Sequence, residues 1–347
     1  MNIKLGISEL VENKDISKND INMIMREIMQ GNITPAQFGS FVTALRIKGE
    51  TPEEIAGMAE AMREFSEKII TKLPVIDTCG TGGDGKNWFN ISTAVSFVVA
   101  GAGIPVAKHG NRAMSGSSGS ADVLEVLGVN IMLDPSNVKK CLEEIGIGFM
   151  FAQKFHPAMK FAGPLRPEIG IRTIFNLLGP LTNPANAKKQ IIGTVNATNA
   201  EKIAKALKIL NTENSIVLNS NSGADEIDIE GNTTIFQVTK NTLKRRRTRP
   251  ADFGLPEGKN THLISNTSKE SAKIISDIFD GSGSDINSSA EEISRRNCVI
   301  INSAAAIFVS GLSDSFQDAA LVATDSIDSG SAKLKLNNLI DITTKMK

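Results

Sequence analysis

The first seventy residues have the pattern of short amphipathic helices. Thr34–Gln37 and Thr51–Glu54 each place a threonine before a proline, with Gln or Glu three positions after the threonine. Such a threonine caps a helix, and proline is favoured at the first helical position. Gly31 and Gly49 suit the ends of the preceding helices. The pattern predicts several helices joined by tight turns, among them Asn22–Met29, Pro35–Lys48 and Pro52–Ile69.

Beyond Leu73 the pattern changes to short β-type runs that alternate with helical segments. Val75-Ile76 leads into a glycine-rich loop, and a helix over Ile91–Ala102 follows that loop. This alternation predicts a mostly parallel sheet with helices on both faces. The further strands that it predicts are Ile104–Ala107, Asn130–Leu133, Gln190–Val195, Ser215–Leu218 and Thr233–Val238. The further helices that it predicts are Ala121–Leu127, Glu201–Leu210 and Cys298–Val309.

The change of pattern predicts two units of α/β class. We expect a small all-helical domain at residues 1–70 and a large α/β domain at residues 71–347. Pro157–Pro184 is rich in proline, glycine and arginine, and we expect it to be partly helical and partly loop. Lys244–Arg249 carries a strong positive charge run, and we expect it to form a solvated loop.

Composition adds a few constraints. The chain of 347 residues has equal numbers of basic and acidic residues, 38 of each, so its bulk charge does not point to nucleic acid or a membrane. Cys79, Cys141 and Cys298 lie far apart, which argues against a zinc site or a disulfide framework. The N-terminus lacks a long apolar core, and Val95–Ala102 is too short to span a bilayer. We therefore expect a reduced, cytoplasmic protein.

The glycine-rich loop Thr78–Asn87, TCGTGGDGKN, partly matches two nucleotide-binding motifs. Its glycines fit G-x-G-x-x-G, but no Asp or Glu follows at the distance from which it would hold a ribose. The glycines and Lys86 also fit the start of a P-loop, but Asn87 stands where Ser or Thr would hold magnesium. Neither motif is complete, so both matches are attributed to the density of glycines.

The same loop suits a phosphorylated sugar. Glycine N–H groups can form an anion-binding nest, and Ser92 and Thr93 stand at the start of the next helix, where phosphate is favoured. Asp84 suits sugar hydroxyls. A second segment, Lys108–Asp122, also follows a strand and carries cations, hydroxyls and glycines, so it would form a second anion cradle at the same sheet edge. Two cradles indicate a ligand with phosphates at both ends, whereas without a ligand the glycines would form an ordinary turn.

Five blocks of sequence occur in the order that is typical of one family. They are CGTGGDG, NIST (Asn90–Thr93), KHGNRAMSG with GSADVLE (Lys108–Glu125), GIRTIFNLLGPLTNPA (Gly170–Ala185) and GADE (Gly223–Glu226). Over nearly the whole chain, the sequence closely resembles the anthranilate phosphoribosyltransferases of tryptophan biosynthesis. These enzymes transfer the phosphoribosyl group of phosphoribosyl pyrophosphate (PRPP) to the amine of anthranilate, release pyrophosphate and use magnesium.

The resemblance implies the residues of the site. The positions that meet PRPP are Gly80, Gly83, Asp84, Trp88, Asn90, Ile91, Ser92, Thr93, Lys108, His109, Gly110, Asn111, Arg112, Ala113, Met114, Ser115, Gly116 and Ser120. The positions that meet anthranilate are Gly80, Asn111, His156 and Arg166. The positions that meet magnesium, with two ions expected, are Ser92, Asp225 and Glu226. The resemblance also implies that helices from about 155–185 join the helical domain, that the chain forms a homodimer, and that it has no nucleic-acid or membrane partner.

The chemistry of these residues agrees with the implied roles but leaves alternatives open. Asp225 and Glu226 suit a magnesium ion that keeps waters and bridges to pyrophosphate oxygens, although GADE is also typical of a solvated turn. Arg166 can pair with a carboxylate through two hydrogen bonds, or it can be a surface arginine. The amine of anthranilate is already a nucleophile, so we expect positioning and electrostatic stabilisation, with no enzyme nucleophile and no assigned base.

Three positions depart from the family pattern, and two other functions stay open. Trp88, Ser117 and Asp228 stand where a small residue, a lysine and a hydroxyl residue, respectively, are usual. The first alternative is a pyrimidine nucleoside phosphorylase, which shares the fold. The second is a non-catalytic relative that binds nucleic acid, for which Lys244–Arg249 would be the contact.

Overall fold

A seven-stranded sheet forms the centre of the large domain. The computed structural model describes residues 1–113 and 118–346, and the strand order is β3-β2-β1-β4-β5-β6-β7. Strands β1 to β5 are parallel, while β6 and β7 are added antiparallel at one edge, which confirms the predicted mostly parallel sheet. The strands are β1 (Ile76–Gly80), β2 (Val106–Gly110), β3 (Ile147–Phe151), β4 (Lys189–Gly193), β5 (Asn214–Ser220), β6 (Thr233–Thr239) and β7 (Leu243–Thr248).

The order of the strands reverses beside β1. From β1 the chain proceeds through β2 to β3 on one side, and β4 then begins the other side. In open α/β sheets, ligands bind outside the carboxyl ends of the strands at such a switch point. Gly80 pairs with Gly193 in the register, so β1 and β4 end level with each other. Two glycines therefore lie side by side where a ligand is expected.

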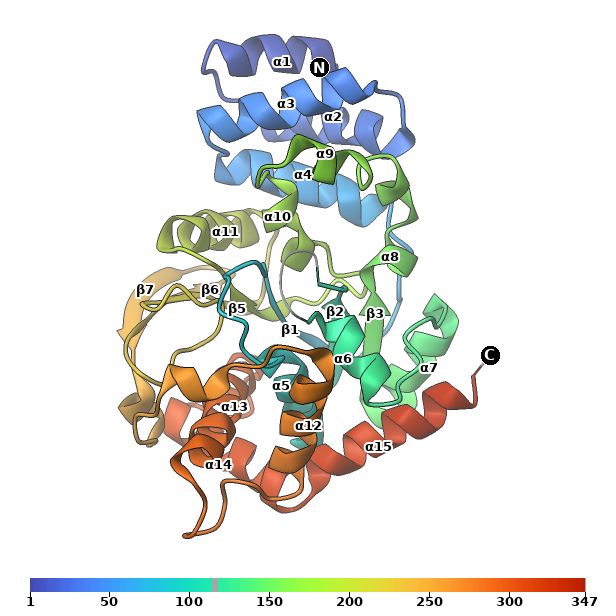
Figure 1. The fold of residues 1–347 in the computed structure, drawn as a ribbon. Helices are drawn as coiled ribbons and strands as arrows, with labels where there is room; N and C mark the ends of the chain where they lie inside the picture. Colours follow the sequence, from blue (N-terminus) through green and yellow to red (C-terminus); the bar gives the residue numbers. More distant parts are fainter. Residues whose placement is uncertain (114–117, 347) are drawn as a thin grey trace.

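Helices cover both faces of the sheet (Figure 1). Side chains of β4 and β5 alternate between two apolar cores: Ile192 and Val217 join the core shared with the helical domain, and Ile191 and Ile216 join the other. The first core also includes α11 (Ala197–Ile209). The second core includes α5 (Ile91–Gly101), α6 (Ser120–Val126), α7 (Pro135–Ile145), α12 (Ser268–Phe279), α13 (Ala290–Ser310), α14 (Phe316–Asp328) and α15 (Ser331–Thr344).

The small domain is a helical bundle at one end of the molecule (Figure 1). Thr34 and Thr51 each form the predicted capping box, and Gly31 ends the second helix in the left-handed conformation. Two short helices from the middle of the chain, α9 (Leu165–Ile169) and α10 (Phe175–Leu178), pack against the same core. The helices of the bundle are α1 (Ile3–Val11), α2 (Lys18–Gln30), α3 (Pro35–Lys48) and α4 (Pro52–Glu64).

The fourth helix is shorter than the predicted span Pro52–Ile69. It ends at Glu64, and the chain then crosses to the sheet as an extended linker. In this linker Ile69 N–H donates to Pro184 O at 3.1 Å, a partner outside any helix. Ile69 is buried against the core of the α/β domain, so its apolar character reflects the linker and not the helix.

The segment Asn130–Leu133 is not a strand, contrary to the prediction. It lies outside the sheet, and Asn130 N–H donates to Thr343 Oγ1 of α15 at 3.1 Å. Ile131 and Leu133 are buried, so the segment has the hydrophobicity of a strand without its backbone pairing. The edge of the sheet is occupied instead by β3, which was not predicted.

The basic run is a strand and not the predicted loop. Residues 243–248 form β7 at the edge of the sheet, with exposed side chains from Lys244 to Arg247. Charged side chains at an edge oppose pairing with another chain. Arg245 lies over the ring of Phe236 at 5.8 Å and Arg246 over the ring of Phe316 at 4.4 Å. Part of the basic run is therefore held against aromatic rings.

We predict that Gly193→Ala lowers the free energy of unfolding by at least about 2 kcal/mol, because the new Cβ would overlap the backbone of Asp225. Gly39→Ala is the matched control, since a Cβ at this position of α3 meets nothing within 4 Å. This control is expected to leave stability unchanged or to raise it by up to about 1 kcal/mol. Urea unfolding measures both changes, and equal stability of the two variants would contradict the proposed packing.

Candidate active site

The glycine loop leaves the end of β1 through three left-handed glycines. Gly82, Gly83 and Gly85 have φ angles of 67°, 71° and 71°, which side chains other than glycine rarely adopt. Asp84 turns back on its own loop and accepts a hydrogen bond from Lys86 N–H at 3.1 Å. The loop therefore presents backbone groups at the switch point of the sheet.

An acidic loop after β5 meets the glycine loop at this point. Asp225 Oδ2 accepts a hydrogen bond from Gly82 N–H at 2.8 Å, across 143 residues of sequence. A Cβ on either Gly80 or Gly193 would overlap Asp225. Both glycines are thus required by the close approach of the acidic loop. The sequence also allowed a solvated turn at Asp225. Instead, Asp225 packs against the ends of β1 and β4.

Glu226 reaches the start of the helix that follows the glycine loop. Its Oε1 accepts a hydrogen bond from Ser92 N–H at 3.1 Å, at the N-terminus of α5. A helix N-terminus favours negative charge because its N–H groups are free and the dipole is positive there. The structure therefore brings together the three residues predicted at the metal: Ser92, Asp225 and Glu226.

The charged forms of the Asp225 and Glu226 carboxyl groups are disfavoured by burial and by neighbouring negative charge. Burial, followed by the charge of the neighbouring Asp84, raises the pKa of Asp225 to about 6. Burial, followed by the charge of Asp225, raises the pKa of Glu226 well above its usual range. Carboxylate oxygens in this arrangement favour a bound cation.

A buried lysine lies beneath the same loop. Lys108, on β2, donates from Nζ to Thr78 O at 2.6 Å and lies 3.4 Å from Ser92 Oγ. Burial lowers the pKa of Lys108, while nearby Asp77 opposes this shift. Asp77 accepts hydrogen bonds from His109 N–H and from Asn183, at 3.1 and 2.8 Å. Asp77 and Asn183 were not predicted, because neither belongs to a motif that contacts a ligand.

The second cradle is described only in part. The predicted residues Met114, Ser115 and Gly116, and the departure Ser117, lie outside the described residues. At the end of the segment, Ser120 Oγ donates to Asn111 O at 3.3 Å. The side chain of Asn90, which directly precedes α5, donates to Ser118 O at 3.2 Å. The two predicted cradles therefore meet at one edge of the sheet.

Arg112 is directed to carboxylates of its own segment. Its guanidinium donates to Asp122 at 3.0 Å and to Glu125 at 2.5 and 2.9 Å, all at partly or largely exposed positions. Asp122 also accepts a hydrogen bond from Ala113 N–H at 3.0 Å. These contacts join Arg112 and Ala113 to the start of α6. They also occupy a cation that was predicted to meet phosphate.

Two histidine rings, those of His109 on β2 and of His156, pack against each other. The ring centroids of His109 and His156 are 5.0 Å apart, and both side chains are buried. Burial lowers the pKa of His156 to about 4 and that of His109 well below its usual range. In the described residues, the Nε2 atom of each ring has no hydrogen-bond partner. Each neutral ring therefore keeps, among the described residues, an unpaired nitrogen that is buried from solvent.

Arg166 belongs to the part of the chain that packs against the core of the helical domain. It is on α9, half-buried, with its guanidinium 5.7 Å from the centroid of the Phe175 ring. Burial lowers its pKa. A partly desolvated arginine on an aromatic face binds a carboxylate more strongly than a solvated arginine would.

Two of the departures from the family pattern have a structural role. Trp88 is half-buried against the main core and forms an isolated bridge with Ile264. Asp228 is buried and accepts a hydrogen bond from Glu230 N–H at 3.0 Å, so its carboxylate closes its own turn.

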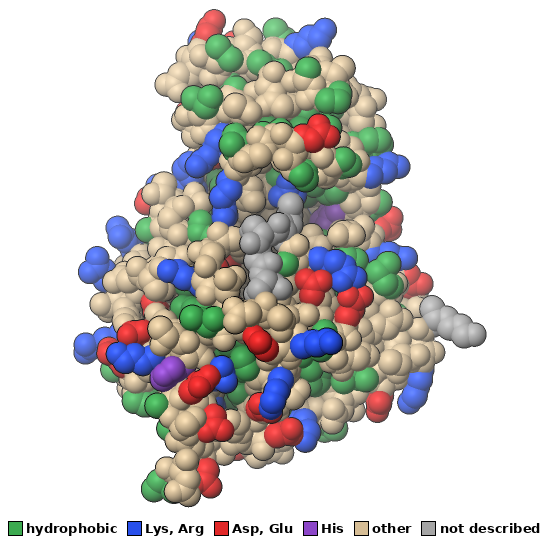
Figure 2. All heavy atoms as spheres, in the orientation of Figure 1, with side chains coloured by type: hydrophobic (Ala, Val, Ile, Leu, Met, Phe, Trp, Pro, Cys, Tyr) green, Lys and Arg blue, Asp and Glu red, His purple; other side chains and the backbone are tan. Residues whose placement is uncertain are grey.

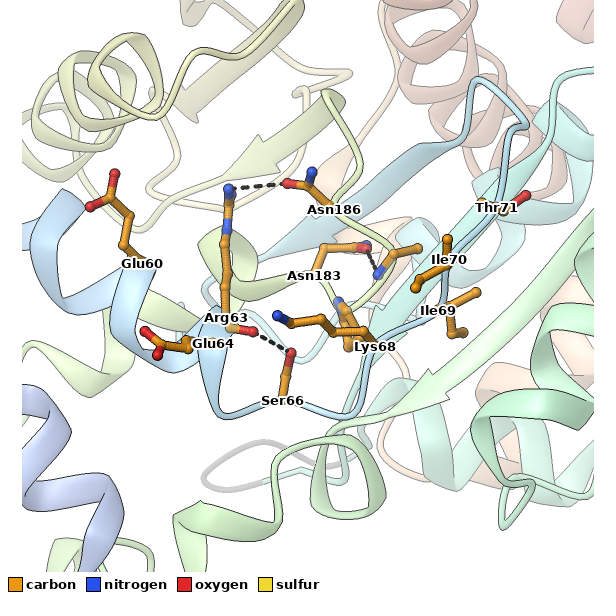
Figure 3. Close-up of a pocket in the computed structure, with 12 residues that line it drawn as sticks. Glu60, Arg63, Glu64, Ser66, Lys68, Ile69, Ile70, Thr71, Asn183 and Asn186 are labelled. Carbon is orange, nitrogen blue, oxygen red and sulfur yellow. Dashed lines mark hydrogen bonds between the residues drawn. The ribbon is translucent and has the colours of Figure 1, made fainter.

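A cavity of about 510 Å³ borders Asn183, the hydrogen-bond partner of Asp77. It is bordered by the linker Ser66–Thr71 and the segment Asn183–Asn186, where the chain passes between the helical domain and the sheet (Figure 3). Arg63 extends along it toward Asn186, at 3.4 Å, and donates from Nε to Leu181 O at 2.6 Å. None of the predicted site residues lines this cavity.

Charge is mixed around the waist between the two domains. Figure 2 shows side chains of both signs there. Within residues 1–113 and 118–346, no group of three His, Cys, Asp or Glu side chains could by itself hold a metal ion. A metal at this site would therefore depend on ligands besides the protein side chains.

In the described part of the chain, no helix is long and apolar enough to cross a membrane.

Two family models match consecutive parts of the chain. The model described as "Glycosyl transferase family, helical bundle domain" matches residues 6–66, and "Glycosyl transferase family, a/b domain" matches residues 72–333. The anthranilate phosphoribosyltransferase of Chloroflexus aurantiacus is 48% identical over 344 residues, which are 99% of each chain. Both domains are therefore shared with this relative.

Solved structures agree with the sequence comparison. The anthranilate phosphoribosyltransferase of Thermus thermophilus has a TM-score of 0.90 at 34% identity, over 98% of this chain and 99% of that one. The enzyme of Saccharomyces cerevisiae in complex with PRPP and Mg has a TM-score of 0.89 at 28% identity, over 99% and 98%. Its complex with 4-fluoroanthranilate has a TM-score of 0.87 at 27% identity, over 99% and 98%. These similarities confirm the predicted resemblance, and the chain belongs to the anthranilate phosphoribosyltransferase family.

Proposed function

We propose that the protein transfers the phosphoribosyl group of PRPP to anthranilate, giving N-(5-phosphoribosyl)anthranilate and pyrophosphate, in tryptophan biosynthesis. The observation that carries this proposal is the contact of Asp225 and Glu226 with backbone N–H groups of Gly82 and Ser92. It joins an acidic pair to an anion-binding loop. Structures of the yeast enzyme with PRPP and Mg, and with 4-fluoroanthranilate, support the choice of substrates.

The donor binds across the glycine loop and the second cradle. Gly83 and Asp84 offer backbone N–H groups, and Asp84 offers a carboxylate to ribose hydroxyls. The start of α5 favours a phosphate beside Ser92 and Thr93. The remaining positions that the resemblance assigns to the donor site are Gly80, Trp88, Asn90, Ile91, Lys108, His109, Gly110, Asn111, Arg112, Ala113, Met114, Ser115, Gly116 and Ser120.

Magnesium would be held by Ser92, Asp225 and Glu226, two ions being expected. Magnesium is usually bound by one or two carboxylates together with waters and substrate phosphates, so the residues present fit this ion. When bound, it neutralises the pyrophosphate that leaves. Burial, followed by neighbouring negative charge, raises the pKa of both carboxyls, and a bound cation would offset both effects.

The acceptor binds between the histidines and Arg166. Arg166 pairs with the carboxylate of anthranilate, and Asn111 and Gly80 border the same space. His156, whose Nε2 atom has no hydrogen-bond partner in the described residues, would contact the amine. These contacts direct the nitrogen lone pair toward the anomeric carbon, and positioning of this kind lowers the barrier without an enzyme nucleophile.

Departure of pyrophosphate is favoured by groups that are already in place. Positive charge develops on the ribose ring as the bond to pyrophosphate breaks, and negative charge grows on the leaving oxygens. Lys108 and the loop N–H groups are preorganised to stabilise the leaving oxygens. Asp84 lies on the ribose side, where its negative charge offsets the positive charge on the ring. No residue is assigned as a general base.

A homodimer is part of the proposal. The outer helices of the bundle expose large apolar side chains, such as Leu5 at 58% and Ile47 at 82% exposure. Exposed apolar groups that lie close together favour association of two copies. A cytoplasmic location is expected from the sequence.

Two alternative functions give different experimental results. A pyrimidine nucleoside phosphorylase would cleave a nucleoside with phosphate and would not consume anthranilate. A nucleic-acid-binding relative would use β7, but Arg245 and Arg246 are held over aromatic rings, which leaves a smaller free basic surface. A gel-shift assay at moderate salt tests the second alternative, for which tight DNA binding without turnover is expected.

We predict that Asp225→Asn together with Glu226→Gln reduces kcat/KM for PRPP by at least about a hundredfold, because the leaving group loses its magnesium-binding carboxylates. The loss of anthranilate fluorescence measures turnover. Glu230→Gln, an exposed carboxylate of the same loop, is the matched control and keeps wild-type activity. A double variant with unchanged rates would reject the metal role of the acidic pair.

We predict that the stability of the protein depends on pH through His156. Its folded pKa is about 4, below the unfolded value of about 6.5, so between these values the unfolded chain binds a proton that the folded chain does not. The free energy of unfolding therefore falls by up to about 3 kcal/mol as the pH falls from 7 to 4. Urea unfolding at several pH values should show a smaller fall for His156→Gln, and equal falls in both proteins would contradict a buried neutral ring.

A further inference from the structure

An arginine from the helical side of the molecule holds the glycine loop. Arg172 donates from Nη1 to Gly83 O at 2.7 Å and from Nη2 to Gly82 O at 3.2 Å. These two carbonyls are adjacent, and the planar guanidinium is suited to bridge such a pair. Arg172 lies between α9 and α10, outside the residues proposed to bind substrate.

The same peptide segment is held from its other side. Gly82 N–H donates to Asp225 Oδ2 at 2.8 Å, while the carbonyls of Gly82 and Gly83 face Arg172. Both glycines have left-handed backbone angles. Because glycine has no side chain, its backbone can also adopt many other conformations. The two contacts together therefore restrict a segment that is intrinsically mobile.

The contacts of the Gly82 and Gly83 carbonyls with Arg172 determine the direction of the next N–H group in each peptide unit. In a peptide unit the C=O and N–H groups point in opposite directions. When Arg172 fixes the oxygens of Gly82 and Gly83, it also fixes the directions of the N–H groups of Gly83 and Asp84. These are the groups that would bind phosphate oxygens in the proposed function.

We propose that Arg172 is a positioning residue that orders the glycine loop before PRPP binds. This inference rests on the proposed function for the identity of the ligand. It does not depend on that function for the contact itself. Without Arg172 the cost of ordering the loop falls on the binding step, because flexible glycines lose conformational freedom when the ligand binds.

Arg172 also lies on the segment that carries Arg166. Gly170, with φ of 70°, ends α9 between the two arginines. Thr173 N–H then donates to Asn176 Oδ1 at 2.9 Å, which fixes the chain after Arg172. A short, well-anchored segment of the helical side therefore contacts the donor loop and carries the proposed acceptor residue.

The test compares Arg172→Ala and Arg172→Lys with the wild-type protein. Because two hydrogen bonds to a charged group are lost, the KM for PRPP should rise about tenfold in Arg172→Ala while kcat changes less than about threefold. Arg172→Lys, which can hold one carbonyl, should lie between them. Without any substrate, hydrogen exchange of the amides at 82–86 should be faster in Arg172→Ala. Arg46→Ala, an exposed arginine at the end of α3, is the control and should match the wild type in both measurements.

The outcomes separate the possible errors. A KM for PRPP within twofold of wild type overturns the positioning role. A raised KM with unchanged exchange at 82–86 also overturns it, because Arg172 would then contact the substrate directly. If the wild-type protein has no turnover with anthranilate and PRPP, the proposed function fails. The exchange measurement still tests the ordering of the loop in that case.

Discussion

The close approach of the acidic loop to the ends of β1 and β4 is the constraint on which the site depends. Gly80 and Gly193 are register partners, and Asp225 lies against both where no side chain could fit. This packing brings a loop that follows β5 across the switch point of the sheet. It places carboxylates opposite a glycine loop whose N–H groups favour anions. The same two glycines thus serve the packing of the strand ends and the chemistry of the site.

The charges of the site explain why it is suited to a metal and a phosphorylated ligand. Asp225 and Glu226 are half-buried next to each other, and each has a raised pKa because its charge is poorly solvated. Lys108 is buried below them and has a lowered pKa for the same reason. Charges kept from water interact more strongly with a bound cation or anion than solvated charges do. The poorly solvated charges of Asp225, Glu226 and Lys108 would therefore be stabilised by ligands of opposite charge.

The sequence predicted well the features that depend on local chemistry. Each of these features depends on residues that are close together in sequence. Examples are the capping threonines at 34 and 51, the glycine-rich turn, and the alternation of strands and helices. Local patterns failed where burial came from distant elements, as at Asn130–Leu133, which packs on α15. They failed again at the edge strand β7, because its charged side chains have the composition of a loop.

The site was predicted mainly through its ordered blocks of sequence. Spacing alone could not show that Asp225 meets Gly82, because 143 residues separate them. Nor could it show that Arg112 pairs with Glu125, or that Arg172 holds the glycine loop, because both depend on side-chain direction. The most direct test of the account is a crystal structure of the protein with PRPP and magnesium. The account predicts pyrophosphate oxygens against the N–H groups of Gly83 and Asp84, and metal beside Glu226. Density for PRPP elsewhere, such as in the cavity beside Arg63, would contradict it.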